Sequence, residues 1–340
     1  MTSLAMPELR ATHLPVVLLY HRVGAASVDP WALAVSPEHF SQHLDVLSAG
    51  TVVPLCDMLQ SLQCGTLTPG TVAITFDDGY AETASIVQPM LERYDAPATF
   101  YLPTGAINSR DEFWWDELES VVLISERLPA RLSIEIDGQQ LDWESAGNEH
   151  QAWTAEDVRR ANQWRAWEDP LPSPRHALYR DLWQRCQRLT DSVRKSIMRE
   201  VRVWAGGARP ARATHRTLTN DEVCELASSR VVDIGAHTVT HPALAALSCF
   251  EQRLEIEPSK RGLEDLTGQP IRTFAYPFGR RVDYTEETVS LVRMAGFEGA
   301  CSNFSGSIAA GVDPFQLPRI FVQDWDGDEL SRRLASLARG

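Results

Sequence analysis

Two adjacent carboxylates suggest metal and proton chemistry in this sequence. Asp77 and Asp78 directly follow the apolar run 72–76 and precede a glycine. Neighbouring carboxylates repel each other and lose hydration on burial unless a cation offsets them. One of them could therefore bind a metal ion while the other accepts a proton as a general base. The alternative interpretation is an N-cap of the helix that follows.

Two histidines four residues apart form the second candidate group. His237 and His241 would lie on one face of a helical turn, where both can bind the same ion. His39 and His43 have the same spacing, but they lie in a predicted capped amphipathic helix with no carboxylate nearby. We assign that first pair a structural role. The later pair differs because it leaves a predicted buried strand and is followed at once by Pro242.

Two further segments also follow predicted strands. The turn 276–279, Tyr-Pro-Phe-Gly, could direct backbone N–H groups such as that of Phe278 toward a developing negative charge. His21 ends the first apolar run, 16–20. A single histidine is usually structural, but βα folds place their active sites where strands end. We therefore group these two segments with the carboxylates and the histidine pair.

The elements that must position these residues are short runs that are apolar on both faces. Such runs suit strands buried on both sides of a parallel sheet. They alternate with capped helical patterns, which predicts an α/β fold, either a βα barrel or a doubly wound sheet. The runs are 16–20, 51–53, 72–76, 98–102, 231–234, 271–275, 299–301 and 319–322.

The stretch 105–214 interrupts this alternation and is rich in tryptophan. We predict a mostly helical insertion there, with a hairpin at 132–141 and helices at 155–167 and 176–203. The barrel domain would then comprise 1–104 and 215–340. The tryptophans are expected to form a small core of the insertion rather than a ligand platform. They are Trp114, Trp115, Trp143, Trp153, Trp164, Trp167, Trp183 and Trp204.

Composition excludes several classes of protein. The 340 residues carry a formal charge of -14, from 46 acidic and 32 basic side chains, so the basic footprint of a nucleic-acid binder is missing. No apolar run approaches the roughly 20 residues that span a bilayer, and no secretory signal pattern is visible. We therefore expect a cytoplasmic protein. The six cysteines lack C-x-x-C spacing and are expected to be reduced thiols.

Three of these segments resemble motifs of a known family, the polysaccharide deacetylases of carbohydrate esterase family 4. The Thr-Phe-Asp-Asp-Gly segment 75–79 and the His-x-x-x-His-Pro segment 237–242 are similar to its first two motifs, in the same order. The turn 276–279 is similar to its third motif. The resemblance covers about 14–104 and 217–325. It implies a distorted (β/α) barrel with fewer than eight regular repeats.

The resemblance also implies roles for individual residues. Asp77 would be the catalytic base, and the backbone N–H of Phe278 would stabilise the oxyanion. Asp78, His237 and His241 would hold a divalent metal ion, with Zn²⁺ expected. Such a site hydrolyses an acetamide to acetate and a free amine.

The sequence departs from the family pattern at two points. The third motif usually opens with an arginine that orients the catalytic aspartate, and Ala275 occupies that position. Arg319, at the last predicted strand, is our candidate replacement. The family's late histidine, the general acid, is also missing, and His21 at the first strand is the candidate instead. This early position is similar to the branch that acts on poly-N-acetylglucosamine, and the first and last strands of a closed barrel are neighbours.

The expected reaction is N-deacetylation of an amino sugar or small glycoconjugate. Tyr80, Tyr276 and Trp114 are candidate substrate-binding residues. For Trp114, anchoring of the insertion is favoured over stacking on a sugar ring. The insertion should narrow the pocket and select small substrates over long polymers. Two alternatives stay open: hydrolysis of a non-sugar amide, ureide or cyclic imide, and a non-haem iron oxygenase, which also uses two histidines and one carboxylate.

Overall fold

The computed structural model describes residues 14–25, 28–145, 154–207 and 210–337. The chain divides into two compact units. The first comprises 1–25, 33–109 and 217–340, and the second comprises 26–32 and 110–216. Within the described residues, no helix combines the length and apolar character needed to cross a membrane.

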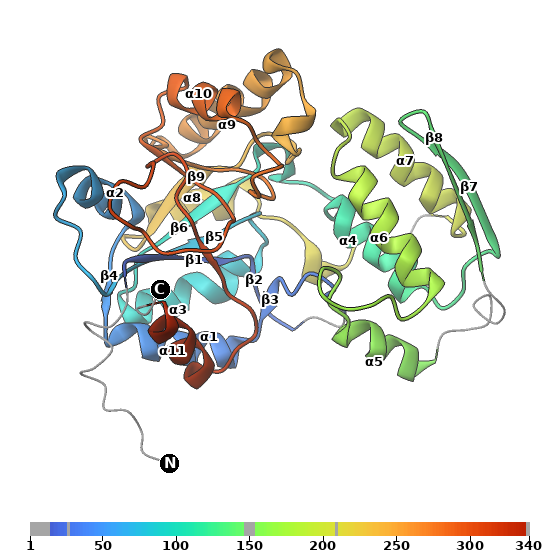
Figure 1. Ribbon diagram of the computed structural model, residues 1–340, viewed down its shortest axis with the longest axis horizontal. Coiled ribbons are helices and arrows are strands. Elements are labelled where there is room, and N and C mark those ends of the chain that lie inside the picture. Colours follow the sequence, from blue (N-terminus) through green and yellow to red (C-terminus); the bar gives the residue numbers. More distant parts are fainter. Residues whose placement is uncertain (1–13, 26–27, 146–153, 208–209, 338–340) are drawn as a thin grey trace. The chain divides into compact units, whose positions relative to one another are not determined.

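The first unit is built on a curled parallel sheet (Figure 1). Its strands follow the order β11-β10-β9-β6-β5-β1-β12, and β4 pairs with the start of β5 outside that order. A parallel bridge between Cys301 and Leu317 links the β11 end of the sheet to the segment before β12. The expected distorted (β/α) barrel is therefore confirmed. The strands are β1 (Val16–Tyr20), β4 (Thr51–Val52), β5 (Thr71–Phe76), β6 (Ala98–Leu102), β9 (Val232–Ala236), β10 (Thr273–Ala275), β11 (Gly299–Cys301) and β12 (Ile320–Phe321).

The register of the sheet brings the carboxyl ends of its strands to one edge. Tyr20 at the end of β1 pairs with Phe76 at the end of β5, and Phe76 pairs with Phe100 of β6. Tyr101 of β6 pairs with Gly235 of β9. A Cβ at Gly235 would lie 2.4 Å from the Tyr101 ring, so only glycine permits this approach. Loops that leave these strands consequently start close together.

Helices and one short pair of strands complete the first unit. Side chains cap the starts of two of these helices: Ser36 accepts a hydrogen bond from the His39 backbone, and Thr219 forms a capping box with Glu222. The helices are α1 (Pro37–Ser48), α2 (Leu55–Cys64), α3 (Gln88–Tyr94), α8 (Asn220–Ser228), α9 (Cys249–Thr267), α10 (Glu286–Met294) and α11 (Gly327–Ser336). A π-turn at Thr83–Val87 precedes α3, and 3₁₀ turns lie at Thr104–Ala106 and Leu244–Ala246. The strand pair is β2 (Arg22–Val23) and β3 (Ala34–Val35).

The second unit is mostly helical and contains one hairpin. The hairpin turns at Asp137 and Gly138, both with positive φ, as predicted. The single helix expected over 176–203 is instead two helices, because the chain leaves helical geometry at Thr190 before restarting at Asp191. The elements are α4 (Trp114–Glu119), the π-turn Ser120–Ile124, β7 (Arg131–Ile136), β8 (Gln139–Glu144), α5 (Ala155–Gln163), α6 (Pro174–Cys186), α7 (Asp191–Trp204) and the 3₁₀ turn Ala213–His215.

Tryptophans form much of the packing in the second unit. Trp31 stacks on Trp183 at a centroid distance of 3.9 Å and donates its indole N–H to the Tyr179 hydroxyl. Trp31 comes from the segment 26–32, which the sequence patterns did not associate with this unit. Trp167, in contrast, is 41% exposed. The predicted core member Trp153 lies outside the described residues.

Candidate active site

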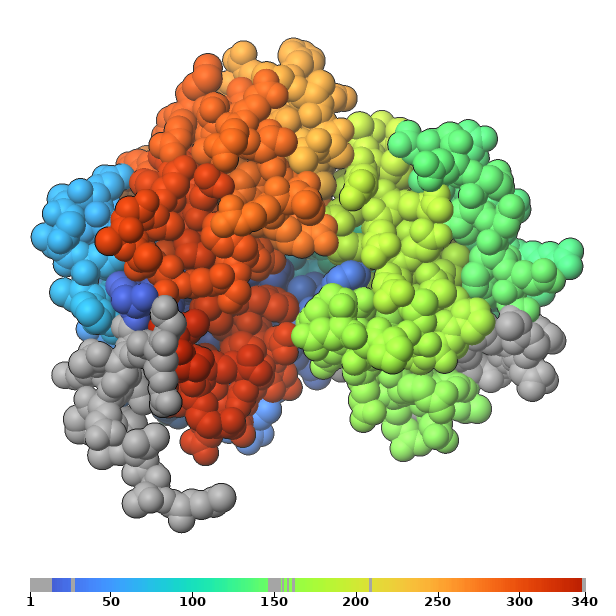
Figure 2. Space-filling view, in the orientation of Figure 1, coloured from blue at the N-terminus to red at the C-terminus, as the bar shows by residue number. Residues whose placement is uncertain are grey.

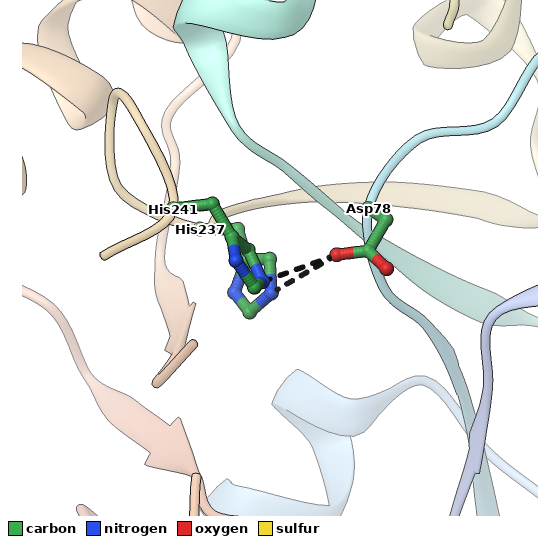
Figure 3. Close-up of side chains that lie close together, drawn as sticks. All are labelled: Asp78, His237 and His241. Carbon is green, nitrogen blue, oxygen red and sulfur yellow. Dashed lines mark ion pairs between the residues drawn. The ribbon is translucent and has the colours of Figure 1, made fainter. Parts of the chain in front are cut away.

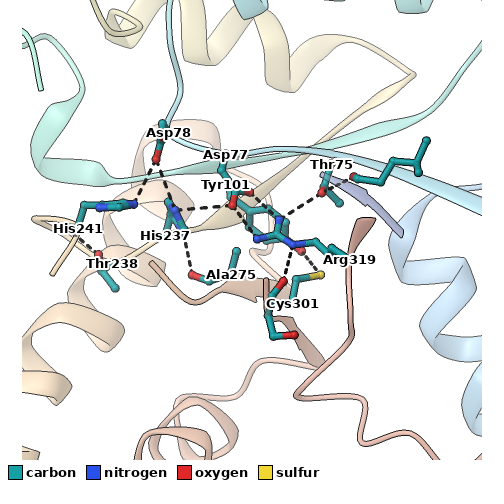
Figure 4. Close-up of polar contacts among 12 residues, drawn as sticks. Thr75, Asp77, Asp78, Tyr101, His237, Thr238, His241, Ala275, Cys301 and Arg319 are labelled. Carbon is teal, nitrogen blue, oxygen red and sulfur yellow. Dashed lines mark hydrogen bonds and ion pairs between the residues drawn. The ribbon is translucent and has the colours of Figure 1, made fainter. Parts of the chain in front are cut away.

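Five candidate residues lie close together where strands of the first unit end (Figure 4): Asp77, Asp78, His237, His241 and Arg319. Asp77 and Asp78 directly follow β5, and His237 directly follows β9. Asp77 is tied to the neighbouring strand because its backbone N–H donates to the carbonyl of Tyr20 in β1. The His237 N–H donates in the same way to the carbonyl of Leu102 in β6. The parallel sheet thus joins residues that are far apart in the chain.

Asp78, His237 and His241 form a buried group that could hold a metal ion. Each offers one ligand atom, and these atoms all lie within 4.8 Å of one another. Asp78 Oδ1 is 3.2 Å from His241 Nε2 and 3.6 Å from His237 Nε2. Both imidazole rings point toward the same carboxylate oxygen (Figure 3). The side chains are 1–7% exposed, so water can solvate the carboxylate only weakly.

The hydrogen bonds of this group fit a cation. His237 Nδ1 lies 2.7 Å from the carbonyl oxygen of Ala275, which can only accept, so Nδ1 carries a proton and Nε2 is the nitrogen that could bind an ion. Asp78 Oδ1 is buried, and within the described residues no backbone or hydroxyl group donates to it. Two imidazole nitrogens and one carboxylate are a usual ligand set for zinc, with open positions for water and substrate. The residues present therefore fit a divalent metal.

The neighbouring carboxylate has a different environment. Arg319 Nη1 donates to Asp77 Oδ1 and Arg319 Nη2 donates to Asp77 Oδ2, both at 2.7 Å. Arg319 is 1% exposed and is itself held by the Ser302 carbonyl and the Thr75 hydroxyl. Burial alone would raise the pKa of Asp77, but the charge and hydrogen bonds of Arg319 outweigh it and lower that pKa. Asp77 is consequently ionised and fixed in orientation.

The pKa of Asp78 is also lowered, for a different reason. Burial again opposes ionisation, while His237 and His241 stabilise the charged form and hold the pKa well below its usual range. The two adjacent aspartates are therefore both carboxylates near neutral pH. One faces a guanidinium and the other faces two imidazoles, which separates a proton acceptor from a metal ligand.

His21 lies within electrostatic reach of both aspartates. Burial lowers the pKa of its imidazole, and the charges of Asp78 and Asp77 partly oppose that effect. Its Nδ1 is buried and has no hydrogen-bond partner within the described residues. The ring packs edge-on against Phe321 of β12, at a centroid distance of 5.5 Å. The fold therefore places the His21 imidazole next to the aspartate pair without engaging its Nδ1 among the described residues.

Phe278 lies on the turn after β10, with a left-handed φ of 59°. Its ring contacts His241 edge-on at a centroid distance of 4.8 Å. The next residue, Gly279, also has positive φ, and a Cβ there would lie 2.7 Å from the Asn303 backbone nitrogen. The turn thus packs against the candidate metal group. A role for the Phe278 N–H toward an oxyanion stays a prediction.

The three aromatic candidates for substrate binding have packing contacts. Tyr80 is fully buried, with the Arg22 guanidinium 4.7 Å from its ring centre. Tyr276 is also buried, and its hydroxyl donates to the Phe315 carbonyl at 3.0 Å. Trp114 belongs to the second unit, where it packs edge-on against Trp115. Their contact with substrate stays a prediction.

Sequence reasoning did not identify the residues that hold Arg319 in place. Thr75 lies one residue before Phe76 in the aspartate segment, and its hydroxyl also donates to the Leu18 carbonyl. Ser302 contributes only a backbone carbonyl, which any residue type could supply.

The histidine pair at 39 and 43 forms contacts with residues far along the chain. His43 bonds to the backbone of Trp325, and His39 pairs with Asp324. The local sequence did not reveal this carboxylate.

Comparisons with known proteins agree with this geometry. A family model described as polysaccharide deacetylase matches residues 65–127 and 201–300. The putative polysaccharide deacetylase YxkH of Bacillus subtilis is 27% identical over 105 residues, which is 31% of this chain and 36% of that protein. The chain therefore matches only about a third of that relative's length.

Solved structures with the same fold have low sequence identity to this chain. The Streptococcus pyogenes deacetylase PplD, in complex with acetate, is 17% identical with a TM-score of 0.57, covering 94% of this chain and 98% of that one. IcaB from Ammonifex degensii is 18% identical with a TM-score of 0.56, covering 97% and 99%. At such identities the likeness demonstrates a shared fold.

Proposed function

We propose that this chain, a member of the polysaccharide deacetylase family by the match over residues 65–127 and 201–300, is a metal-dependent N-deacetylase. Its substrate would be the acetamido group of an amino sugar or small glycoconjugate. The observation that carries the proposal is the buried group of Asp78, His237 and His241 beside an Asp77 carboxylate held by Arg319. Zn²⁺ is the proposed ion, because two imidazoles and a carboxylate suit it.

A divalent ion bound by Asp78, His237 and His241 would polarise the amide carbonyl and make a water molecule more acidic. The remaining steps belong to the protein. Asp77 accepts the proton of the attacking water at a carboxylate oxygen. Each oxygen of Asp77 accepts one hydrogen bond from Arg319, which leaves lone pairs for this transfer. Arg319 keeps the carboxylate ionised and aligned.

Two further groups would act after water attacks the carbonyl carbon. The backbone N–H of Phe278 would donate to the negatively charged oxygen of the tetrahedral intermediate. His21 would protonate the nitrogen as the C–N bond breaks, because an amine anion is a poor leaving group. The products are acetate and a free amine. The place of His21 near both aspartates and against Phe321 of β12 supports this role.

Family membership favours hydrolysis over an iron oxygenase, and no specific contact favours a non-sugar amide. The test is a screen of acetylated amino sugars, nucleotide sugars and small acetamides with metal-reconstituted protein in nitrogen-purged buffer, with free acetate as the readout. Acetate release from an acetamido sugar is expected. Turnover only with non-sugar amides, or only with oxygen present, would contradict the proposal. A cytoplasmic location stays part of the proposal and is tested by cell fractionation.

A further inference from the structure

The loop 237–241, which we call the histidine loop, carries both imidazoles in a strained backbone. Thr238 has a φ of 67° and His241 a φ of 56°, both in the left-handed region. A residue other than glycine in that region costs on the order of 1–3 kcal/mol and persists only when its surroundings enforce it. The histidine loop therefore needs external contacts that hold this conformation.

One face of the histidine loop is held by the segment after β6. The backbone N–H of Thr104 donates to the Thr238 carbonyl at 3.1 Å, and that of Gly105 donates to the Val239 carbonyl at 2.8 Å. A Cβ at Gly105 would lie 2.7 Å from the Val239 oxygen. Within the loop, the His241 N–H donates to the Thr238 hydroxyl at 3.0 Å. These contacts bind the carbonyl groups of Thr238 and Val239 and the N–H of His241.

The N–H groups in the middle of the histidine loop are bound by a single carboxylate. Glu255 Oε2 accepts from the backbone of Val239 at 2.9 Å and of Thr240 at 2.7 Å. Glu255 Oε1 accepts from the Thr240 hydroxyl at 2.7 Å. Hydrogen bonds to an ionised carboxylate are roughly twice as strong as neutral ones. Both Glu255 oxygens therefore bind the two residues that directly precede His241.

Glu255 is presented by a well-anchored helix. α9 begins with a capping box between Ser248 and Glu251 and buries Ile256, the neighbour of Glu255, in the core. Gln252 accepts a buried hydrogen bond from Thr288 of α10 at 2.7 Å. The two helices lie side by side and form one continuous surface (Figure 2). The carboxylate is thus a fixed point against which the histidine loop is held.

We propose that Glu255 is the positioning residue that pre-organises His237 and His241 for metal binding. Without its three hydrogen bonds the two N–H groups would lose their acceptor, and the strained turn between the imidazoles could relax. Contacts that orient metal ligands typically change metal affinity about 10- to 100-fold when removed. This inference rests on the proposed metal site, and it adds a residue with no local sequence signal.

The test compares Glu255→Ala with Glu255→Gln and Glu257→Ala. The glutamine carbonyl can still accept from both N–H groups, and its amide can donate to the Thr240 hydroxyl. Glu257, on the same helix, forms only ion pairs with Arg253 and Arg261 among its described contacts and is the matched control. Readouts are Zn²⁺ and Co²⁺ affinity by competition titration and the visible absorption spectrum of bound Co²⁺.

We expect Glu255→Ala to weaken metal affinity about 10- to 100-fold and to alter the Co²⁺ spectrum. Glu255→Gln should stay within about threefold of the parent protein, and Glu257→Ala should be unchanged. Circular dichroism checks folding. If the alanine variant unfolds, Thr240→Ala, which removes one of the three hydrogen bonds, takes its place and should weaken affinity while keeping the fold.

Three outcomes would overturn the inference, and they differ in what else they affect. Parent affinity and spectrum in folded Glu255→Ala, or in folded Thr240→Ala where that variant replaces it, would refute the role of Glu255 while the proposed metal site stands. No metal binding by the parent protein would refute both proposals. Equal loss in Glu255→Ala and Glu257→Ala would also refute the role of Glu255, because the effect would then belong to the helix in general.

Discussion

Replacing Asp77 by asparagine separates proton transfer from metal binding. Asp77→Asn keeps the side-chain shape but removes the carboxylate that accepts the proton of water. Loss of a general base typically reduces turnover about 10²- to 10⁴-fold. Asp78, His237 and His241 are untouched, so metal content should remain near that of the parent protein.

The same change also has a calculable cost in stability. Asp77 and Arg319 form a buried pair with two hydrogen bonds of 2.7 Å, and each side chain is less than 5% exposed. Asparagine has one carbonyl oxygen, and its amide N–H groups face the donors of Arg319. Removing one partner of a buried ion pair typically costs about 3–5 kcal/mol, because the other charge stays buried. We expect a loss of that order in the free energy of unfolding.

A double variant separates the loss of the general base from the loss of the buried ion pair. In Asp77→Asn combined with Arg319→Gln, two neutral amides replace the ion pair, and the glutamine amide can still donate to the Ser302 carbonyl. Stability should recover in part, whereas turnover should stay low. The measurements are acetate release, metal content and urea unfolding followed by circular dichroism. Circular dichroism is needed because Trp325 is the only tryptophan of the first unit within the described residues.

Two results would refute this reasoning. A folded Asp77→Asn protein with parent turnover would show that Asp77 is not the base. A folded protein that has lost its metal would show that the roles of Asp77 and Asp78 are reversed.

Three further predictions concern the metal, a buried carboxyl group and substrate length. Chelation should abolish hydrolysis and His241→Ala should lose the ion; full activity after exhaustive chelation would contradict the metal role. Burial, and then the neighbouring Asp116, raise the pKa of Glu119 from 4.5 to about 8, so its contribution to stability is complete below about pH 4.5 and is lost as the pH rises through 8. Each pKa unit is worth about 1.4 kcal/mol, so unfolding followed by tryptophan fluorescence should show a free energy of unfolding that falls up to about pH 8.5. Glu119→Gln should flatten this pH dependence. An unchanged slope in that variant would show that Glu119 stays ionised beside Arg212. Finally, a monosaccharide should be turned over faster than an extended oligomer, and a clear preference for the long chain would contradict the expected selection of small substrates.

Sequence alone was sufficient to predict the fold class and the segments that carry the candidate site. The mainly apolar runs before Asp77, His237 and Phe278 are buried strands, because parallel strands covered on both faces are largely apolar. Once those strands pair in parallel, their carboxyl ends share one edge. Local pattern therefore predicted which residues would be neighbours, even though they are far apart in the chain.

Contacts that depend on distant backbone could be decided only by the tertiary structure. Arg319 was a candidate because it lies at the last predicted strand, but its two hydrogen bonds to Asp77, 242 residues away, depend on β12 lying beside β1. Trp31 joins the second unit, although it precedes that unit's main segment by many residues. Glu255 has an ordinary helical sequence context, and its contacts arise because α9 packs beside the histidine loop. Hydrophobic periodicity reports which face of an element is buried, whereas the partner across that face is chosen by the packing of the whole chain.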